Sequence, residues 1–158
     1  MKILYTDIDY VLSLASEIAF HNTKWGLIHK FNVKAVYIYN EIIRKTDAEI
    51  VVTSDWKIHF TLKQLQEIFT EWAGIIKPPF DVTSIIPGVT LQLLEVWRAK
   101  EILAHVAEHK PESWVAIDDL YLSPYIPDEH FVYCSRINEG VKQTGKKEEL
   151  IRKLNIND

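Results

Sequence analysis

The stretch Lys2-Ile3-Leu4-Tyr5-Thr6-Asp7-Ile8-Asp9-Tyr10-Val11-Leu12 places two aspartates directly after a short apolar run. The run at residues 3–5 is too short for a helix and is typical of a strand buried on both faces of a sheet. In an open α/β sheet, ligands bind beyond the carboxyl ends of the strands, which is where Asp7 and Asp9 would lie. Because two carboxylates one residue apart repel each other, this pair predicts a nearby cation or a shared proton.

The composition is that of a globular protein. The chain has 158 residues, 47% of them hydrophobic and 25% charged, with a formal net charge of −4. These values predict one domain over residues 1–158 and give no global sign of a nucleic-acid or membrane surface. No apolar run approaches the roughly 20 residues that span a bilayer. Cys134 is the only cysteine, so an intrachain disulfide is excluded and a reducing, cytoplasmic location is expected.

The first half of the chain predicts a strand, a helix and a second strand. Residues 13–33 show no clean period and predict a loop with short helical pieces that passes over the end of the sheet. An amphipathic helix is predicted over Val33–Thr46, with Asn32 as its N-cap. A second buried strand follows at residues 50–53. This order predicts a parallel pair of strands joined by a right-handed crossover.

A second amphipathic helix is predicted over residues 61–72. Thr61 is its cap, Trp72 belongs to its inward stripe, and Gly74 ends it. Residues 75–88 contain three prolines and predict an irregular connection with room for an edge strand.

The later elements continue the alternation of helices and strands. They are a helix over 98–109, a buried strand over 114–117, a loop over 120–129, a strand over 130–134 and a last helix over Lys146–Leu154. The inward face of the 98–109 helix is assigned to Ile102, Leu103, Val106 and Ala107. This alternation predicts an α/β fold with a mainly parallel central sheet and helices on both faces.

Three of the predicted strands end in polar side chains that parallel packing would bring to one edge. They are Asp7 and Asp9, then Thr53 and Ser54, then Asp118 and Asp119. Four carboxylates without histidine suit a hard cation, and Mg²⁺ fits best because it keeps waters and is usually shared with phosphate. Zinc is disfavoured, since no His/Cys spacing accompanies the cluster. Any one aspartate alone is explained as a cap or turn residue, but the coincidence of three strand ends favours a site.

At these residues the sequence resembles the haloacid dehalogenase (HAD) superfamily of phosphotransferases. Residues 7–12 look like its first motif, residues 50–53 like its second, and residues 114–119 like its fourth. The segments 53–57 and 98–102 are most similar to the HAD domains associated with nucleic-acid repair proteins, the Swiss Army Knife group. The resemblance implies a three-layer Rossmann-like fold, and the short inserts between motifs leave no room for a full cap domain.

The resemblance also implies a Mg²⁺-dependent phosphatase. Asp7 would be the nucleophile that forms an aspartyl-phosphate, and Asp9 would act first as general acid and then as general base. Mg²⁺ would be held by Asp7, Asp118 and Asp119, together with the backbone carbonyl of Asp9.

The phosphate site implied by the resemblance uses residues of the second motif and a later cation. Thr53 would bind the phosphoryl oxygens, with Ser54 beside it. Arg98, or Lys100 as the second choice, would neutralise charge in the transition state. The expected partner is a phosphorylated substrate, either a small phosphoester or a nucleic-acid end or nucleotide; no obligate protein partner is expected. No run of interleaved basic and aromatic residues indicates a nucleic-acid groove.

Two residues depart from the family pattern. Tyr10 stands where the family usually has glycine, and Lys57 stands where the sub-type usually has arginine, which loses a bidentate fork. Tyr10 leaves open an alternative, a catalytically weak or inactive HAD-like module that binds metal and phosphate. A receiver-type phospho-acceptor domain is a third reading. It is disfavoured because the acidic pairs occur here in the wrong order along the chain.

Overall fold

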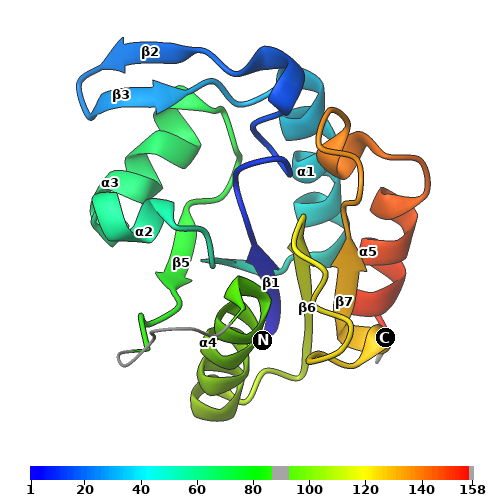
Figure 1. The fold of residues 1–158 in the computed structure, drawn as a ribbon. Helices are drawn as coiled ribbons and strands as arrows, with labels where there is room; N and C mark the ends of the chain where they lie inside the picture. Colours follow the sequence, from blue (N-terminus) through cyan, green and yellow to red (C-terminus); the bar gives the residue numbers. More distant parts are fainter. Residues whose placement is uncertain (87–92, 157–158) are drawn as a thin grey trace.

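A five-stranded sheet forms the centre of the fold, with strand order β5-β4-β1-β6-β7 and every neighbouring pair parallel (Figure 1). The computed structural model describes residues 1–86 and 93–156. The strands are β1 (Lys2–Thr6), β4 (Glu49–Val52), β5 (Pro79–Val82), β6 (Ser113–Asp118) and β7 (Phe131–Tyr133). The predicted α/β class and parallel sheet are confirmed.

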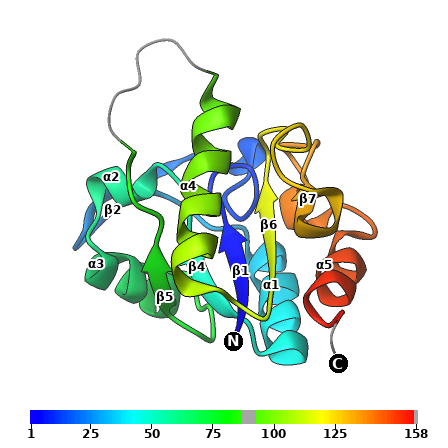
Figure 2. The ribbon, with the colours of Figure 1, turned by 90° about the horizontal axis from the view of Figure 1, so that it is seen from below.

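Helices cover both faces of the sheet (Figure 2). One face carries α1 (Val33–Thr46), α5 (Lys146–Leu154), and α3 (Leu62–Glu67) with its continuation η2 (Ile68–Trp72). The other face carries α4 (Leu94–His109). Single turns complete the set: η1 (Ala15–Glu17), α2 (Trp56–His59), η3 (Asp128–His130) and η4 (Gly140–Lys142). Among the helices that the structure describes, none is long and apolar enough to cross a membrane.

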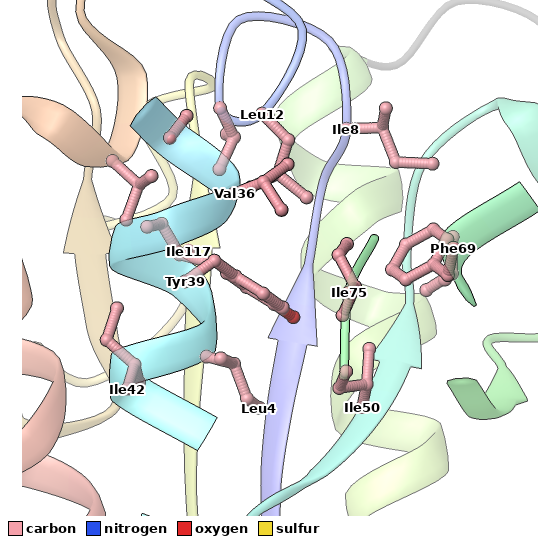
Figure 3. Packing of buried hydrophobic residues seen from close by; sticks show 14 of the residues in the cluster. Leu4, Ile8, Leu12, Val36, Tyr39, Ile42, Ile50, Phe69, Ile75 and Ile117 are labelled. Atoms are coloured by element: carbon pink, nitrogen blue, oxygen red, sulfur yellow. The ribbon is translucent and has the colours of Figure 1, made fainter. Parts of the chain in front are cut away.

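Alternate side chains of β1 enter two separate apolar clusters, because successive residues of a strand point to opposite faces. Leu4 packs on the α1 side, where Tyr39 extends from α1 toward β1 (Figure 3). Ile3 and Tyr5 pack on the opposite side, with Ile102 of α4. These three side chains of β1 are fully buried. The central position of β1 therefore agrees with its short, uninterrupted apolar run.

The loop predicted over residues 13–33 contains an antiparallel hairpin that was not predicted. β2 (Phe20–Thr23) pairs with β3 (Gly26–His29), and Thr23 lies opposite Gly26 across a two-residue turn. The hairpin exposes two large apolar side chains, Phe20 and Leu27. Only Ile28 of the two strands is buried, so residues 20–29 show no alternation of apolar and polar residues that would predict a strand.

The helix predicted over residues 61–72 changes its geometry midway. Thr61 caps α3 through a capping box, as predicted. From Ile68 the helix widens into a π turn, in which the Ala73 N–H donates to the Ile68 carbonyl at 2.9 Å. The wider turn changes the phase of the helix, and Trp72 is 37% exposed. Its predicted place in the inward stripe is therefore wrong.

Helix α4 begins at Leu94, earlier than the predicted residue 98. Its buried face comprises Arg98, Ala99, Ile102 and His105. Leu103 and Ala107, predicted to point inward, are exposed. Arg98 and His105 occupy buried positions where a helical period would place apolar residues. A period fitted to the apolar residues alone therefore assigns the wrong side chains to the inward face.

The remaining predictions agree with the structure apart from small shifts at element ends. β5 is the edge strand allowed for within residues 75–88; residues 87–88 lie outside the described residues. The 130–134 strand is shorter than predicted, because His130 belongs to η3. Cys134 is fully buried, and burial raises the pKa of its thiol.

Gly140 lies against the loop that carries the first two aspartates. Its φ is +53°, and a Cβ there would collide with the Val11 carbonyl oxygen and come within 2.9 Å of the Tyr10 carbonyl oxygen. We expect Gly140→Ala to lower the free energy of unfolding by roughly 2–4 kcal/mol, because left-handed strain and overpacking add. Urea denaturation measures the loss. Gly145→Ala is the control, with φ +85° and open space for the Cβ, and should cost about 1 kcal/mol. If Gly140→Ala and Gly145→Ala lost the same free energy of unfolding, the close approach of Gly140 to the two carbonyl oxygens would not add to the cost.

Candidate active site

The carboxyl ends of β1, β4 and β6 lie side by side at one edge of the sheet. Their register aligns Thr6 with Val52 on one side and with Ile117 on the other. The residues that come next on the three strands are Asp7, Thr53 and Asp118. The parallel sheet thus brings together the three strand ends that the sequence singles out.

Three carboxylates form a compact group at this edge. One oxygen each from Asp7, Asp118 and Asp119 lies within 4.8 Å of the others. Burial, followed by the negative charge of Asp7, raises the pKa of Asp119 to about 7, and the same causes raise the pKa of Asp118. Because their pKa values are raised, these carboxyls ionise readily only when a positive charge lies close by. A set of ligands made up only of oxygen atoms suits Mg²⁺. The group therefore fits a Mg²⁺ site, of which the Asp9 side chain is not a member.

Arg98 of α4 provides fixed positive charge to the same carboxylates. Its Nη1 donates to Asp118 Oδ2 at 2.7 Å and lies 3.3 Å from Asp7 Oδ1, while Nη2 lies 3.4 Å from Asp55 Oδ1. Burial disfavours the charged guanidinium, but the carboxylates of Asp118 and Asp7 outweigh it and raise its pKa. Lys100, the second choice from the sequence, is exposed and lies 4.9 Å from the centre of a tryptophan ring on the same helix. Arg98 is thus the cation that reaches the acidic group.

The carboxyl of Asp9 contacts a different set of residues. The Trp56 indole N–H donates to Asp9 Oδ2 at 3.0 Å, and His29 Nδ1 lies 3.5 Å from Asp9 Oδ1. Burial raises the pKa of Asp9 and the charge of Asp7 raises it further, against the opposing effects of Trp56 and His29. A carboxyl that keeps its proton to higher pH is suited to general acid catalysis.

Two hydroxyls at the end of β4 are buried at the same edge. Thr53 Oγ1 has no hydrogen-bond partner among the residues described. An unsatisfied buried hydroxyl costs roughly 1–3 kcal/mol. A phosphoryl oxygen bound at this edge would satisfy it. Ser54 Oγ is placed differently, because it accepts from the Trp56 backbone N–H at 3.5 Å and so lies at the start of α2.

Lys57 joins the site to α4 in a way that the sequence did not predict. Its Nζ donates to Thr83 Oγ1 at 2.8 Å and forms an ion pair with Glu101 of α4. Burial lowers the pKa of Lys57, although the hydrogen bond and charge of Glu101 oppose that effect. Arg98 and Glu101 are one helical turn apart, so α4 presents a cation to the acidic group and an anion to Lys57.

The sequence also missed the partners of Asp9. Trp56 comes three residues after the second strand motif, within the segment 53–57 that resembles the sub-type, and that position was its only signal. His29 falls within residues 13–33, for which the sequence predicts only a loop over the end of the sheet and no partner for this histidine. Its contact with Asp9 depends on the hairpin, which has no apolar pattern.

Tyr10 adopts the backbone conformation that glycine would adopt at this position. Its φ is +63°, in the left-handed region, and its N–H donates to the Ser13 carbonyl at 2.6 Å. A non-glycine residue in this region costs roughly 1–2 kcal/mol. The turn after the two aspartates therefore holds Tyr10 in a strained conformation that glycine adopts without this cost.

An open groove of about 460 Å³ is lined in part by the residues that contact the Asp9 carboxyl. It lies between the β2–β3 hairpin and α2, and two of its lining residues, His29 and Trp56, are those that contact Asp9. The rings that line it are Phe20, Trp25, His29, Trp56, His59 and Phe60. A ligand in this groove would thus meet mainly aromatic surface.

Without Mg²⁺, Asp119→Asn is expected to stabilise the protein in a pH-dependent way. The folded-state pKa of about 7 exceeds the ordinary value of 3.8, so between these values the unfolded state releases a proton that the folded state keeps. Stability from this group therefore falls as pH rises from about 4 to 7. In EDTA, the advantage of the variant should grow over this window and level off at roughly 1–3 kcal/mol, after allowance for solvent screening. Denaturation curves at several pH values test this; a pH-independent difference would contradict it. Excess Mg²⁺ should remove the advantage.

Comparison with known families gives a match over most of the chain. Residues 3–143 match the model of a family described as the HAD domain in Swiss Army Knife RNA repair proteins. This range contains every residue of the edge site described above. No curated protein and no solved structure matched the chain.

Proposed function

The chain belongs to the family of HAD domains in Swiss Army Knife RNA repair proteins, and from this premise we propose that it is a Mg²⁺-dependent phosphatase that acts through an aspartyl-phosphate on Asp7. The observation that carries the proposal is the grouping of Asp7 with Asp118, Asp119 and Arg98 at the carboxyl ends of parallel strands. A carboxylate nucleophile, a divalent cation site and a fixed cation at one point are the parts that phosphoryl transfer needs.

In the first step, an Asp7 carboxylate oxygen attacks phosphorus as the bond from phosphorus to the leaving oxygen breaks. The carboxylic acid of Asp9 gives its proton to that leaving oxygen, which departs as an alcohol. The raised pKa of Asp9 supports this role, because part of the population carries the proton to higher pH. The product is an acyl phosphate on Asp7.

In the second step, the Asp9 carboxylate accepts a proton from a water molecule. The water oxygen bonds to phosphorus, the bond between phosphorus and the Asp7 oxygen breaks, and inorganic phosphate leaves. Asp7 is restored as a carboxylate and Asp9 as an acid, so the cycle is closed.

Other residues stabilise the negative charge of the phosphoryl group. Mg²⁺ held by the carboxylates of Asp7, Asp118 and Asp119 would supply electrostatic stabilisation of the phosphoryl oxygens. Thr53 Oγ1, which has no hydrogen-bond partner within residues 1–86 and 93–156, would donate to one of these oxygens. Arg98 remains positively charged and also balances the acidic group.

The groove beside Asp9 indicates the class of leaving group. Because Asp9 gives its proton to the leaving oxygen, the rest of the leaving group extends from this point toward the aromatic groove. Stacking on aromatic rings contributes about 1–3 kcal/mol per nucleobase and tolerates any base. We therefore propose a nucleotide or a nucleic-acid end as substrate, in preference to an aliphatic phosphate ester.

The test is a substrate panel with Mg²⁺ that includes 5′- and 3′-phosphorylated oligonucleotides, mononucleotides and an aliphatic phosphate ester. Phe20→Ala removes an exposed ring of the hairpin without opening the core. It should lower kcat/KM for nucleotides by about 5- to 100-fold and leave the aliphatic ester unaffected. Equal effects on both substrates would reject base stacking, while turnover of the ester would still support the phosphatase.

The alternative is a module that binds metal and phosphate without turnover, and Tyr10 is the residue that suggested it. Tyr10 adopts a left-handed backbone of the kind that glycine favours, which is compatible with an active loop and supports the phosphatase over this alternative. Mg²⁺ binding without hydrolysis of any ester in the panel would support it.

A further inference from the structure

A second cluster of ligand-type side chains lies between β5 and the C-terminal part of α4. Asp81, His105 and His109 each place one donor atom within 4.8 Å of the others. Asp81 Oδ2 lies 3.4 Å from His105 Nε2 and 3.8 Å from His109 Nε2. The two histidines are four residues apart on α4, a spacing that places imidazoles on one face and is used by zinc-binding helices.

Each of the three side chains is held by a second contact through its other polar atom. His105 Nδ1 lies 2.9 Å from the hydroxyl of the buried Tyr5, and His109 Nδ1 donates to the His105 carbonyl oxygen at 3.1 Å. Asp81 Oδ1 accepts from the Val82 backbone N–H at 2.8 Å. Contacts of this kind fix the ring orientation and tautomer of metal-binding histidines.

The tautomer of His109 indicates whether a cation could bind between this side chain and Asp81. A carbonyl oxygen only accepts, so the hydrogen of His109 is on Nδ1, and in the neutral ring Nε2 carries a lone pair. In this neutral ring no proton lies between Nε2 and the Asp81 carboxylate 3.8 Å away, whereas an imidazolium would place one there. A cation at their meeting point would take the place of that proton.

We propose that Asp81, His105 and His109 form a second metal site, which binds Zn²⁺ through two imidazole nitrogens and one carboxylate oxygen. Imidazole ligands favour zinc over magnesium. Tetrahedral zinc with bonds of about 2.0–2.1 Å places its ligand atoms roughly 3.3 Å apart. The distances from Asp81 Oδ2 to the two Nε2 atoms, 3.4 and 3.8 Å, are close to this value. The two imidazole rings stack, with centroids 3.9 Å apart and planes at 9°, so zinc binding requires the rings to rotate out of this stack until both Nε2 atoms face the ion.

The site is separate from the acidic group at the sheet edge. His105 lies seven residues after Arg98 on α4, which is about 10 Å along the helix axis. Asp81 and His109 are partly exposed, so an ion and a water molecule can reach the fourth position. Bound zinc would join the edge strand β5 directly to α4.

Zn²⁺ titration by calorimetry, with excess Mg²⁺ present to occupy the carboxylate site, tests the proposal. One equivalent of Zn²⁺ should bind to the full chain, and Co²⁺ in its place should give a visible absorption band of a four-coordinate site. Zinc at 100 times its Kd should raise the Tm by roughly 5–10 °C. Asp81→Asn and His109→Ala should each weaken binding by at least 10-fold.

Matched variants separate this site from general metal binding. His21→Ala removes a histidine of the hairpin, and Asp119→Asn alters the acidic group; both should keep the Zn²⁺ equivalent. Tyr5→Phe preserves the packing and removes only the hydroxyl, and should weaken binding by roughly 10- to 100-fold. If zinc does not bind, or binds equally to Asp81→Asn and His109→Ala, the cluster is a hydrogen-bonded His–Asp network and the proposal is wrong. The phosphatase assay is unaffected by that outcome.

Discussion

Asp7→Asn is expected to lower phosphatase turnover by roughly 10⁴-fold or more, because an amide oxygen is too weak a nucleophile to form the covalent intermediate. The substitution keeps the shape of the side chain and removes one of the three carboxylates that compete for positive charge. The folded state should therefore persist, with a Tm equal to or above that of the wild type. Hydrolysis of p-nitrophenyl phosphate with Mg²⁺ measures the loss.

Asp47→Asn is the matched control for this experiment. Asp47 follows α1 at the opposite edge of the sheet, where its side chain is exposed, and its replacement should leave turnover unchanged. Activity retained in Asp7→Asn, in a preparation free of contaminating phosphatase, would rule out Asp7 as the nucleophile. The grouping of the other carboxylates would then need a different chemistry.

Asp9→Asn is expected to separate the two chemical steps. The p-nitrophenolate leaving group departs with little help from an acid, so the first step should survive in the variant, while the second step loses its base. We expect a burst of p-nitrophenol close to one equivalent of enzyme, followed by steady turnover roughly 10²- to 10⁴-fold below the wild type. Stopped-flow absorbance measures both phases.

The leaving group provides the internal control for Asp9. An alkyl phosphate needs a proton on its leaving oxygen, so Asp9→Asn should give no burst with that substrate. Trp56→Phe removes the indole N–H that donates to Asp9 and should give a milder defect, with the burst absent. Steady turnover of Asp9→Asn at the wild-type rate would contradict the assigned role.

The strands could be predicted from the sequence because burial leaves a direct mark on composition. β1, β4 and β6 are buried on both faces, so each appears as an uninterrupted apolar run followed at once by polar residues. The parallel order then places the three ends together, and Asp7 and Asp118 become neighbours although they are far apart in the chain. The acidic group could be predicted for that reason.

The side chains of α4 were harder to predict. Arg98 and His105 lie on the buried face of this helix, where an apolar pattern predicts only hydrophobic residues. Their burial depends on partners that lie in or directly after the strands β1 and β6. These partners are Asp7 and Asp118 for Arg98, and Tyr5 for His105. A helical period calculated from apolar residues therefore gave the wrong phase just where α4 carries its polar contacts.

The hairpin and the groove could not be predicted, because their contacts are tertiary. Phe20 and Leu27 are exposed, so β2 and β3 lack the alternation that marks a half-buried strand. The contacts of Asp9 with Trp56 and His29 join three segments that carry no common motif. Only the folded chain shows that they meet.

The central place of β1 also affects how the protein is made. Lys2 pairs opposite Ser113, so one side of the strand stays unpaired until more than a hundred further residues have been synthesised. At roughly 5–20 residues per second, an apolar strand with free backbone groups is available to other chains for several seconds or more. The strand that precedes Asp7 is thus exposed in the nascent chain until β6 has been made, and we expect chaperones to protect it during this time. Slower growth at low temperature should raise the yield of folded protein more than it would for a chain with a local, helical core.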